Sequence, residues 1–527
     1  MEESLNNMGD LKDIEEEISK DKKKLNKYKV IIPIILITVI IVFFFVIIFF
    51  LKKSKDICET GEEDKCMECE NNKCIKCNSK YDLINGKCIA TFSINATYQS
   101  TADNESIYLI NNEYKKYINN MEIDEKIVNI SNKYIFKNIG NHTVYMRINL
   151  TDLNLTEFMF SKINKLISIK FSKEFDTKNI TSMKGFFYRC DNLKSIDIHN
   201  LNTENVEDMS YMFSQCLELN TILYPNSKTS KIKNINYMFE KCSHLSSINL
   251  TSFSTQNLEL MSNTFYGCSS LNLIDLSNFN TKNIKDMSSL FKECYNLTSI
   301  KFSNFSTYNL QKMNNMFQNC SSLESINLSY FNTEKVSNME YMFYGCSSLT
   351  SVNLYNFDTK SVKNMISMFS GCSSLTSVDL SKFKTPELTI MSRMFEDCKL
   401  LKYVNISNFI TEKVKSMNFM FKNCYSLISV DLTKFITQNV TDMRHMFYGC
   451  SSLTSIDLSR FSTQNVNNMD YMFYNCSHLN YLDISNFSNS SSFVNAFNLL
   501  PSNGTIKLNK DIVNKIQRLI PKNWKVI

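Results

Sequence analysis

The chain contains little glycine, proline, tryptophan or histidine: 10, 5, 1 and 5 residues among 527. So few glycines and prolines exclude collagen-like and proline-rich chains, and the turns must rely on Asn, Ser and Thr. The histidines are scattered without metal-ligand spacing, and the sequence has no glycine-rich phosphate loop or nucleophile-elbow motif. We therefore expect no enzyme activity, no cofactor and no metal site.

Neither sign of charge dominates, because the formal net charge is only +6. That balance excludes the basic footprint of a nucleic-acid-binding protein. With 43% hydrophobic and 21% charged residues, the chain has the composition of a folded protein. Its length is too great for one ordinary core, which favours several domains or a repeat array.

One long hydrophobic run, from Val30 to Leu51, contains no charged residue and is interrupted only by Pro33 and Thr38. As a helix it would span roughly 30 Å, the thickness of the hydrocarbon core of a bilayer. The run predicts a single transmembrane helix. A cleaved signal peptide is the alternative, but the run exceeds such an apolar region and no small-residue cleavage site follows it.

Lysines flank this run unequally, with six shortly before it and three directly after it: Lys20, Lys22, Lys23, Lys24, Lys27 and Lys29, then Lys52, Lys53 and Lys55. The positive-inside rule places the N-terminus in the cytoplasm and the rest outside, as in a type II plasma-membrane protein. All cysteines and all Asn-x-Ser/Thr glycosylation sequons lie on that outer side, which agrees with an oxidising compartment. The sequons include Asn95, Asn104, Asn129, Asn141, Asn149 and Asn154.

Six cysteines form a compact module beside the predicted membrane helix: Cys58, Cys66, Cys69, Cys74, Cys77 and Cys88. Two paired C-x-x-C steps could hold zinc, although the gap between them is shorter than in zinc ribbons. Three disulfides in an extracellular stalk module are the favoured interpretation. The module resembles the furin-like or growth-factor-like cysteine modules of protist surface proteins. Its connectivity is open, since six cysteines allow 15 pairings.

The other twelve cysteines recur at a constant interval of 26 residues: Cys190, Cys216, Cys242, Cys268, Cys294, Cys320, Cys346, Cys372, Cys398, Cys424, Cys450 and Cys476. Such a period indicates a solenoid. We number each unit from its cysteine as position one. Because every cysteine is flanked by apolar residues, we expect buried free thiols rather than disulfides between neighbouring units.

Each unit predicts one strand and one short helix. Alternating apolar residues at positions seven and nine indicate a strand whose positions six, eight and ten face outward. Position fourteen is Thr in the first eleven units, and the apolar residues after it, such as Val362, Met365 and Phe369, have helical spacing. Thr359 would be the N-cap of that helix. Gly, Asn or Asp before most cysteines, as at Gly345, Gly371, Asn423 and Gly449, suits a left-handed cap.

The expected fold class is an α/β solenoid of twelve leucine-rich-repeat-like coils, each a strand plus a short helix, preceded by the membrane helix and the disulfide-rich module. The expected parts are a cytoplasmic tail (1–29), the membrane helix (30–51), the cysteine module (56–90), a β-rich leader (91–150), an N-terminal cap with a partial repeat slipped by one residue (151–189), the solenoid (190–488) and a C-terminal cap (489–527). In the last cap, we expect a strand over 505–508, a helix over 510–520 and an apolar plug at Trp524.

The repeat string MFYGCSSLTSVNLYNFDT, from Met342 to Thr359, carries a family resemblance. It resembles the bacterial surface protein 26-residue repeat, a relative of the BspA-like leucine-rich repeats of bacterial and anaerobic-protist surface proteins. The resemblance covers roughly residues 155 to 527. It implies a solenoid displayed on a cell surface, with roles in adhesion or partner recognition. The leader resembles the small β-rich segment found before such arrays.

The outward strand positions are where recognition is expected. Tyr355, Tyr403 and Tyr481 replace Ser or Thr there, and exposed Tyr is a common recognition anchor. Position eight is Asp or Asn in ten of the twelve units, which we interpret as solvated, hydrogen-bonded side chains rather than a cation ladder. Three Asn at that position begin sequons: Asn249, Asn327 and Asn405. Sugars there would shift recognition to the later coils, around Asp431, Asp457, Tyr481 and Asp483. The alternative is that neighbouring coils crowd position eight, so that the glycosylating enzyme leaves all three Asn unmodified.

Two functions fit these patterns. The favoured one is adhesion or recognition of an extracellular protein or glycan ligand by a membrane-anchored solenoid. The alternative is a structural surface-coat protein that acts by self-association and has no specific ligand.

Overall fold

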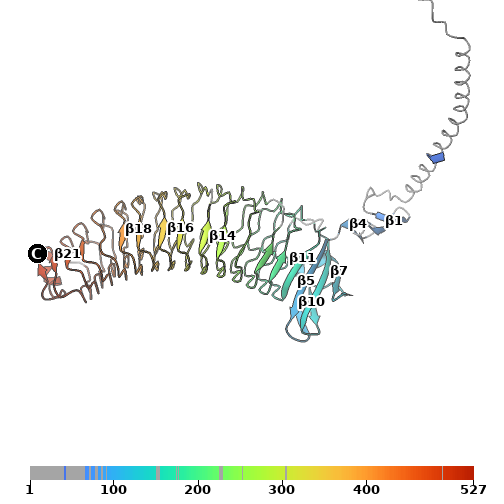
Figure 1. Cartoon of the computed structure of the whole chain (residues 1–527), viewed down its shortest axis with the longest axis horizontal. Coiled ribbons are helices and arrows are strands. Elements are labelled where there is room, and N and C mark those ends of the chain that lie inside the picture. The colour runs from blue at the N-terminus through green and yellow to red at the C-terminus, as the bar shows by residue number, and fades with distance from the viewer. Residues whose placement is uncertain are drawn as a thin grey trace, which may run out of the picture. The chain divides into compact units, whose positions relative to one another are not determined.

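The computed structural model describes residues 41–42, 66–70, 73–77, 81–84, 87–90, 92–149, 155–173, 175, 177–224, 229–251, 253–302, 305–488 and 491–527 (Figure 1). They belong to two compact units, Met1–Ala90 and Thr91–Ile527. Of the predicted membrane segment, only Ile41 and Val42 are described, both helical and exposed, so that prediction falls outside the described residues. Within the described ranges, no helix has the length and apolar character needed to cross a membrane.

The first unit contains the cysteine module, whose described residues form two β-hairpins. Strands β1 (Cys66–Glu70) and β2 (Lys73–Cys77) pair antiparallel, as do β3 (Tyr81–Ile84) and β4 (Lys87–Ala90). Two hairpins bury little apolar surface, so disulfides carry much of the stability of a module of this size.

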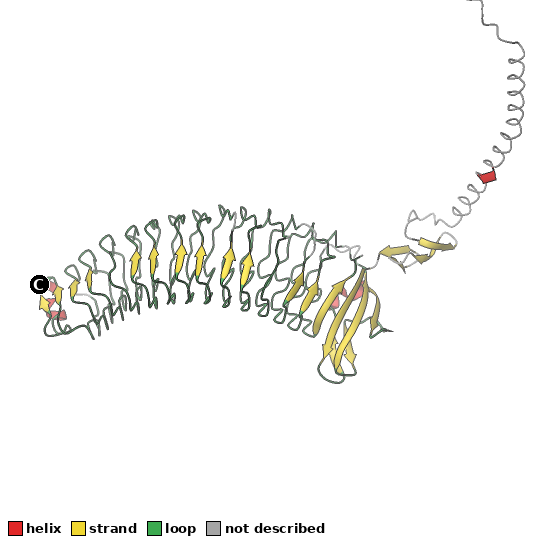
Figure 2. Ribbon diagram, viewed as in Figure 1, coloured by secondary structure: helices red, strands yellow, loops and turns green. Residues whose placement is uncertain are grey.

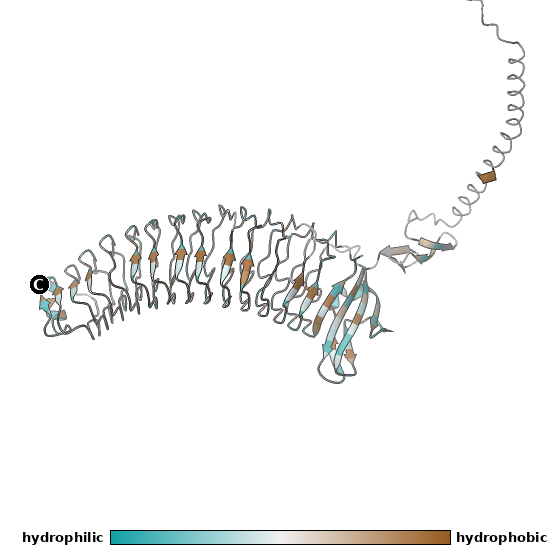
Figure 3. Cartoon of the chain, in the orientation of Figure 1, coloured by the Kyte–Doolittle hydropathy of each residue, from teal (hydrophilic) through white to brown (hydrophobic). Residues whose placement is uncertain are grey.

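The second unit begins with the β-rich leader, whose strands join those of the first coils in one seven-stranded sheet (Figure 2). The order across the sheet is β13 (Thr221–Leu223), β12 (Ser195–Asp197), β11 (Leu166–Phe171), β5 (Phe92–Ser100), β10 (Gly140–Ile148), β7 (Ile118–Ile123) and β8 (Lys126–Ile127). Hydropathy alternates along the leader strands, as expected for a sheet with one buried face (Figure 3). Because β5 pairs antiparallel with β11, the leader covers the edge that the first coil would otherwise leave open.

A small second sheet and one 3-10 helix complete the leader. Strands β6 (Glu105–Tyr108) and β9 (Lys133–Phe136) pair antiparallel, and η1 spans Asn112–Tyr117. The side chain of Asn111 caps η1 by accepting a hydrogen bond from the N–H of Glu113.

The repeat strands lie where the 7/9 alternation predicts them, at positions six to eight. They are β14 (Leu273–Asp275), β15 (Ser299–Lys301), β16 (Ser325–Asn327), β17 (Ser351–Asn353), β18 (Ser377–Asp379), β19 (Tyr403–Asn405), β20 (Ser455–Asp457) and β21 (Tyr481–Asp483). Neighbouring strands pair parallel and in register, with Ile326 beside Val352 for example. The side chains at positions seven and nine face the core, and those at six and eight face outward.

The predicted helix after each Thr is wrong. In the described coils, the stretch carrying Val362, Met365 and Phe369 is a series of turns. Thr359 does not cap a helix, because its hydroxyl instead donates a hydrogen bond to the carbonyl of Lys384 in the next coil at 2.9 Å. The chain is therefore a β-solenoid rather than an α/β solenoid.

Hydrogen bonding between coils explains the absence of the helix. In the turn segment at positions 20 to 26, the backbone N–H at even positions points to the next coil, as Tyr341 donates to the carbonyl of Ile366 and Phe343 to that of Met368, both at 2.9 Å. At odd positions the N–H closes a tight turn, as Met368 donates to the carbonyl of Met365 at 3.3 Å. Because every second N–H is used between coils, the continuous i to i−4 ladder of an α-helix cannot form.

Residues with a left-handed backbone conformation allow this alternation of turns. Position 22 has a positive φ even where it is not glycine, as at Ser367 (φ 53°). The position before the cysteine also has a positive φ, which confirms the left-handed conformation expected there. The angles are 72° at Gly345, 78° at Gly371, 60° at Asn423 and 72° at Gly449. At Gly371 a Cβ atom would lie 3.3 Å from the backbone of Gly345, so this position also favours glycine for close approach between coils.

The core is a set of columns that run along the stack. At position 24, the ring of Phe369 stacks on Phe343 at 5.4 Å and on Phe395 at 5.6 Å. Cys346 and Leu349 are fully buried beside this column. Each coil thus buries its apolar edge only against its neighbours, as in other repeat proteins.

Both ends of the array continue the stack. Within the described residues, thirteen parallel bridges link position nineteen from coil to coil, so the solenoid has about thirteen coils rather than twelve. The first bridge joins Leu155 to Ser182, 27 residues apart, which is the one-residue slip that the sequence predicted. The last bridge joins Asn468 to Ser492.

The C-terminal end closes with β22 (Thr505–Lys507), α2 (Lys510–Ile516) and β23 (Lys525–Val526). Strand β22 pairs parallel with β21, and β23 pairs with β22, so the sheet continues to the end of the chain. Trp524 is 5% exposed, and its ring N–H donates to the carbonyl of Pro501 at 2.8 Å. This packing covers the apolar end of the last coil.

Candidate recognition surface

The outward side chains at positions six, eight and ten of the coils form a surface along the stack, which we call the strand-face surface. The side chain at position eight ends each strand. Asp379 Oδ1 accepts the N–H of Ser381 at 2.9 Å, and Asn353 Oδ1 accepts the N–H of Tyr355 at 3.1 Å. These local turns withdraw the backbone from the ladder after three residues, which explains the short strands.

The three predicted tyrosines are exposed on this surface but do not meet. Tyr355, Tyr403 and Tyr481 are 64%, 56% and 37% exposed. Tyr403 lies beside Ser377 and Tyr481 beside Ser455, so both are at position six and three coils apart. Tyr355 is at position ten, where the ammonium of Lys382 lies 5.1 Å above its ring. A ligand that contacts both Tyr403 and Tyr481 must extend along the stack.

The three predicted aspartates differ in environment. Asp431 and Asp457 are exposed. The hydroxyl and N–H of Thr433 hydrogen-bond to Asp431 Oδ1 at 2.6 and 3.0 Å, and these bonds hold the pKa of Asp431 below its usual value.

Asp483 is only 4% exposed, because its carboxylate pairs with Lys507 of the cap at 3.0 Å. It therefore does not belong to the exposed strand-face surface. The sequence could not show this, because the covering strand comes after the last regular repeat.

Most predicted glycosylation sites are accessible. Asn249, Asn327 and Asn405 are exposed in one row at position eight, and Asn95, Asn104, Asn129 and Asn141 are exposed on the leader, whereas Asn149 is half-buried and Asn154 lies outside the described residues. In the array sequons, the side-chain carbonyl oxygen of the Asn accepts hydrogen bonds from the residue two positions later. Asn249 Oδ1, for example, accepts both the N–H and the hydroxyl of Thr251. Such bonds leave the amide nitrogen, which carries the sugar, outside that turn.

The twelve array cysteines are free and buried. The thiol of Cys346 donates to the carbonyl of Phe317 in the preceding coil at 3.0 Å, and the same contact recurs along the stack. Burial raises the pKa of Cys346 to about 12. Thiolates are the reactive form, so these side chains act as small packing groups rather than as nucleophiles or metal ligands.

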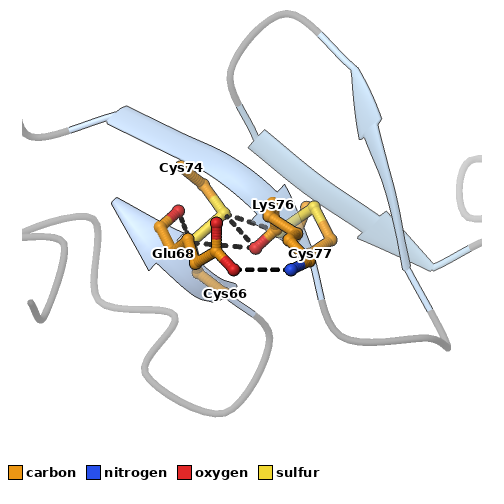
Figure 4. Close-up of a disulfide and its surroundings, with 6 residues drawn as sticks. Cys66, Glu68, Cys74, Lys76 and Cys77 are labelled. Atoms are coloured by element: carbon orange, nitrogen blue, oxygen red, sulfur yellow. Dashed lines mark hydrogen bonds and ion pairs between the residues drawn. A yellow bond between two sulfur atoms is a disulfide. The ribbon is translucent and has the colours of Figure 1, made fainter. Parts of the chain in front are cut away.

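The described part of the N-terminal module contains two disulfides, Cys66–Cys74 and Cys77–Cys88, with Cα atoms 5.8 and 5.6 Å apart (Figure 4). The sulfurs of Cys66, Cys74 and Cys88 lie within 4.8 Å of one another. Because those sulfurs are already bonded in pairs, the zinc alternative is excluded for these residues. Cys58 and the side chain of Cys69 lie outside the part of the chain that the structure describes.

Sequence reasoning missed a Ser–His–Asp arrangement in the leader. His142 Nε2 lies 3.1 Å from Ser100 Oγ, and Nδ1 lies 2.8 Å from Asp124 Oδ2. The serine is only 1% exposed, and its hydroxyl donates to the carbonyl of Asn138 at 2.6 Å. A substrate therefore cannot reach the hydroxyl. The hydrogen bonds instead hold the loops that carry these residues in contact. The three residues come from separate loops and strand ends, so no spacing motif could have indicated it.

The coils define a repeat protein, a solenoid of 26-residue units, which is the repeat architecture that the resemblance to the BspA-like repeats predicted. The chain belongs to the family described as "Mycoplasma protein of unknown function, DUF285", which matches residues 153–273, 222–325, 259–377, 311–429 and 389–514. No curated protein matches the chain.

Two solved structures are similar to parts of the chain. A leucine-rich repeat protein from Eubacterium ventriosum ATCC 27560 shares 16% identity, with a TM-score of 0.27, over 55% of this chain and 85% of its own. A TLR13 structure in complex with ssRNA13 shares 13% identity, with a TM-score of 0.16, over 66% of this chain and 72% of its own.

Proposed function

We propose that this chain is a cell-surface protein whose solenoid recognises an extracellular protein or glycan through the strand-face surface. The observation that carries this proposal is the row of exposed, chemically varied side chains at positions six and eight, of which Tyr403 is the most exposed aromatic. Exposed tyrosine gives a large amphipathic contact area and loses little conformational entropy on binding.

A rigid frame supports these side chains. The backbone of each coil is hydrogen-bonded to its neighbours, and the columns at positions one, four and 24 are buried throughout. The backbone that carries the outward side chains is ordered before a ligand arrives, which lowers the entropic cost of binding.

Residues 30–51 would anchor the protein as a single-pass membrane helix with residues 1–29 in the cytoplasm. The two disulfides of the module support an oxidising location for the module and the solenoid. A tag before Met1 should be protected from added protease on intact cells, and a tag after Ile527 should be digested. Digestion of the first tag alone would contradict this orientation.

The recognition proposal can be tested by attachment. Cells that display the full chain should attach to mucin-coated or collagen-coated plates more than cells without it. Tyr403→Ser with Tyr481→Ser, which installs the residue that most coils carry at position six, should reduce attachment at equal surface display. Tyr425→Ser, which changes an exposed tyrosine at position two, is the matched control.

The surface-coat alternative has a different outcome in the same assay. Cells that cluster with one another but attach to neither coating would favour a coat protein. Attachment that the double variant leaves unchanged would contradict recognition through the strand-face surface.

A further inference from the structure

A hollow of about 310 Å³ opens on the turns that follow the strands of three successive coils. Its lining includes Tyr308, Tyr330, Asn332, Glu334, Asn356 and Asp358. Apart from Ser329 at position ten, the lining residues occupy positions eleven to fifteen of their coils, beyond position eight, where the strands end. The hollow is therefore distinct from the positions that carry Tyr403 and Tyr481.

Two tyrosines make this place unlike the same turns elsewhere in the array. Position eleven is usually Asn, whose amide donates to the carbonyl of the preceding coil, as Asn408 does to Ser381 at 2.6 Å. Tyr330 replaces that Asn and is 57% exposed, and Tyr308 at position fifteen is 61% exposed. Five of the twelve units lack the Asn, and this is the one in which an exposed aromatic ring occupies position eleven.

The polar groups in the hollow are mostly held in place. Asn332 Oδ1 accepts the N–H of Glu334 at 3.1 Å, and the amide of Asn356 donates to the carbonyl of Ser329 at 2.7 Å. Asp358 pairs with Lys360 at 3.1 Å. These contacts fix the groups around the two rings.

One acceptor remains without a charged partner. Among the described residues, the carboxylate of Glu334 has no ion pair. The hollow is therefore lined by two tyrosine side chains, by amide and carboxylate oxygens, and, among the described residues, by one carboxylate that has no ion pair.

We propose that this hollow binds a neutral carbohydrate. The C–H groups of a pyranose face are slightly positive and pack on the electron-rich face of an aromatic ring. Sugar hydroxyls donate hydrogen bonds to fixed carboxylate and amide oxygens, and such bonds to a charged acceptor are stronger than neutral ones. The volume lies at the small end of ligand pockets, roughly 300–1,000 Å³.

A cationic peptide fits these features less well. The ammonium of Lys360 already neutralises Asp358, so only Glu334 could contribute an ion pair, and an exposed pair stabilises little. The proposal goes beyond recognition by the strand-face surface and does not depend on it.

Saturation-transfer NMR and titration calorimetry on the full chain test this proposal, with the protein held in a detergent that carries no sugar. The probes are maltotriose, cellotriose, chitotriose and lactose. We expect at least one of them to bind, with saturation transfer to the ring protons of the sugar. Absence of binding by all four at 10 mM probe, roughly a hundredfold above a 0.1 mM Kd, overturns the proposal.

Variants locate the site. Tyr330→Asn, which restores the residue of other coils, should weaken binding about tenfold, and Glu334→Gln about fivefold, as expected for loss of a stacked ring and of a charge-assisted bond. Tyr330→Phe should retain binding because it keeps the ring. Tyr295→Ser, at an exposed tyrosine outside the lining, is the control and should change nothing.

The outcomes separate this proposal from its alternatives. Binding that Tyr330→Asn leaves unchanged in a chain with unaltered circular dichroism overturns the proposal. Displacement of the bound sugar by penta-lysine at equal concentration also overturns it, in favour of a cationic ligand. Sugar binding that survives Tyr403→Ser and Tyr481→Ser supports it, whatever those variants do to cell attachment.

Discussion

The hydroxyl of Thr411 makes two hydrogen bonds to the backbone of Ile436 in the next coil, donating to its carbonyl at 2.9 Å and accepting its N–H at 2.8 Å. Thr411 is 1% exposed, so water cannot replace this contact at the hydroxyl. The same Thr position forms a column of hydroxyls that links the coils.

Loss of that hydroxyl should destabilise the solenoid. We expect Thr411→Val to lower the free energy of unfolding by about 1–3 kcal/mol, because it leaves a backbone donor and acceptor without their partner. Thr441→Val is the matched control, since the exposed hydroxyl of Thr441 makes one longer bond of 3.2 Å and its loss should cost at most about 0.5 kcal/mol. Urea unfolding of both variants measures the difference, and equal effects would contradict the role of the Thr column.

The array cysteines should remain thiols. Alkylation in denaturant followed by mass spectrometry should find all twelve modified, and the folded protein should react far more slowly because burial raises the thiol pKa, to about 12 at Cys346 and Cys476. Peptides bridged between array cysteines would show that neighbouring coils are cross-linked.

The module should contain a third disulfide. Cys66, Cys74, Cys77 and Cys88 are already paired, which leaves Cys58 and Cys69. In an oxidising compartment these two should pair with each other. Peptide mapping without reduction should recover a Cys58–Cys69 peptide, and free thiols at both positions would refute this expectation.

His445 should make stability depend on pH. Its ring lies between Phe419 at 4.7 Å and Tyr471 at 4.9 Å, and its Nδ1 is buried with no hydrogen-bond partner among the described residues. Burial lowers its pKa, and the charges of Lys422 and Arg444 lower it further. The pKa of His445 is lower in the folded chain than in the unfolded chain, where it is about 6.5, so the neutral ring contributes its full stabilisation above pH 6.5. This stabilisation is lost as the pH falls from 6.5 towards the pKa of the folded state.

The test compares thermal unfolding at pH 7.5 and 5.5. His445→Tyr installs the residue of a neighbouring coil and removes the titrating group. The variant should lose less stability at pH 5.5 than the original chain, while other groups affect both chains alike. An equal loss in the two chains would assign the pH dependence to other residues.

Glycans at position eight should direct ligands of the strand-face surface to the later coils. Asn249, Asn327 and Asn405 are three coils apart, so sugars on them would stand about 14 Å apart at a strand spacing near 4.8 Å. Glycopeptide mapping shows which are occupied. With Asn327 occupied, we expect a ligand footprint around Asp431, Asp457 and Tyr481. A footprint across Asn327 and Asn353 would refute the expectation that the glycans block ligand binding there.

The sequence predicts most of the frame, because the repeat places equivalent residues in equivalent contacts. Leu at position four, the 7/9 alternation and the left-handed residue at Gly371 were all evident from the residues alone. The helix was mispredicted because Val362, Met365 and Phe369 satisfy helical spacing equally well in consecutive turns that donate every second N–H to the next coil. Local sequence does not show where an N–H will point, since that depends on the neighbouring coil.

The sites were harder to predict than the frame. Tyr355, Tyr403 and Tyr481 were identified because they interrupt a regular outward pattern. Tyr308 and Tyr330 interrupt the pattern too, but their proximity depends on the way adjacent turns bend. Asp483 is buried because it pairs with Lys507, a residue of the irregular cap.

The turn segments of the coils form one edge of the solenoid, and their alternating hydrogen bonds give this edge a net dipole along the stack. In most of the described coils, four peptide groups of the turn segment have their N–H toward the following coil and their carbonyl toward the preceding one, as Gly345 and Ser370 illustrate. Peptide dipoles of about 3.5 D therefore add along the edge. Its positive end is the C-terminal one, the opposite sense to an α-helix. Acidic groups are favoured near the last coil and basic groups near the first, so the two ends of this edge would attract ions of opposite sign.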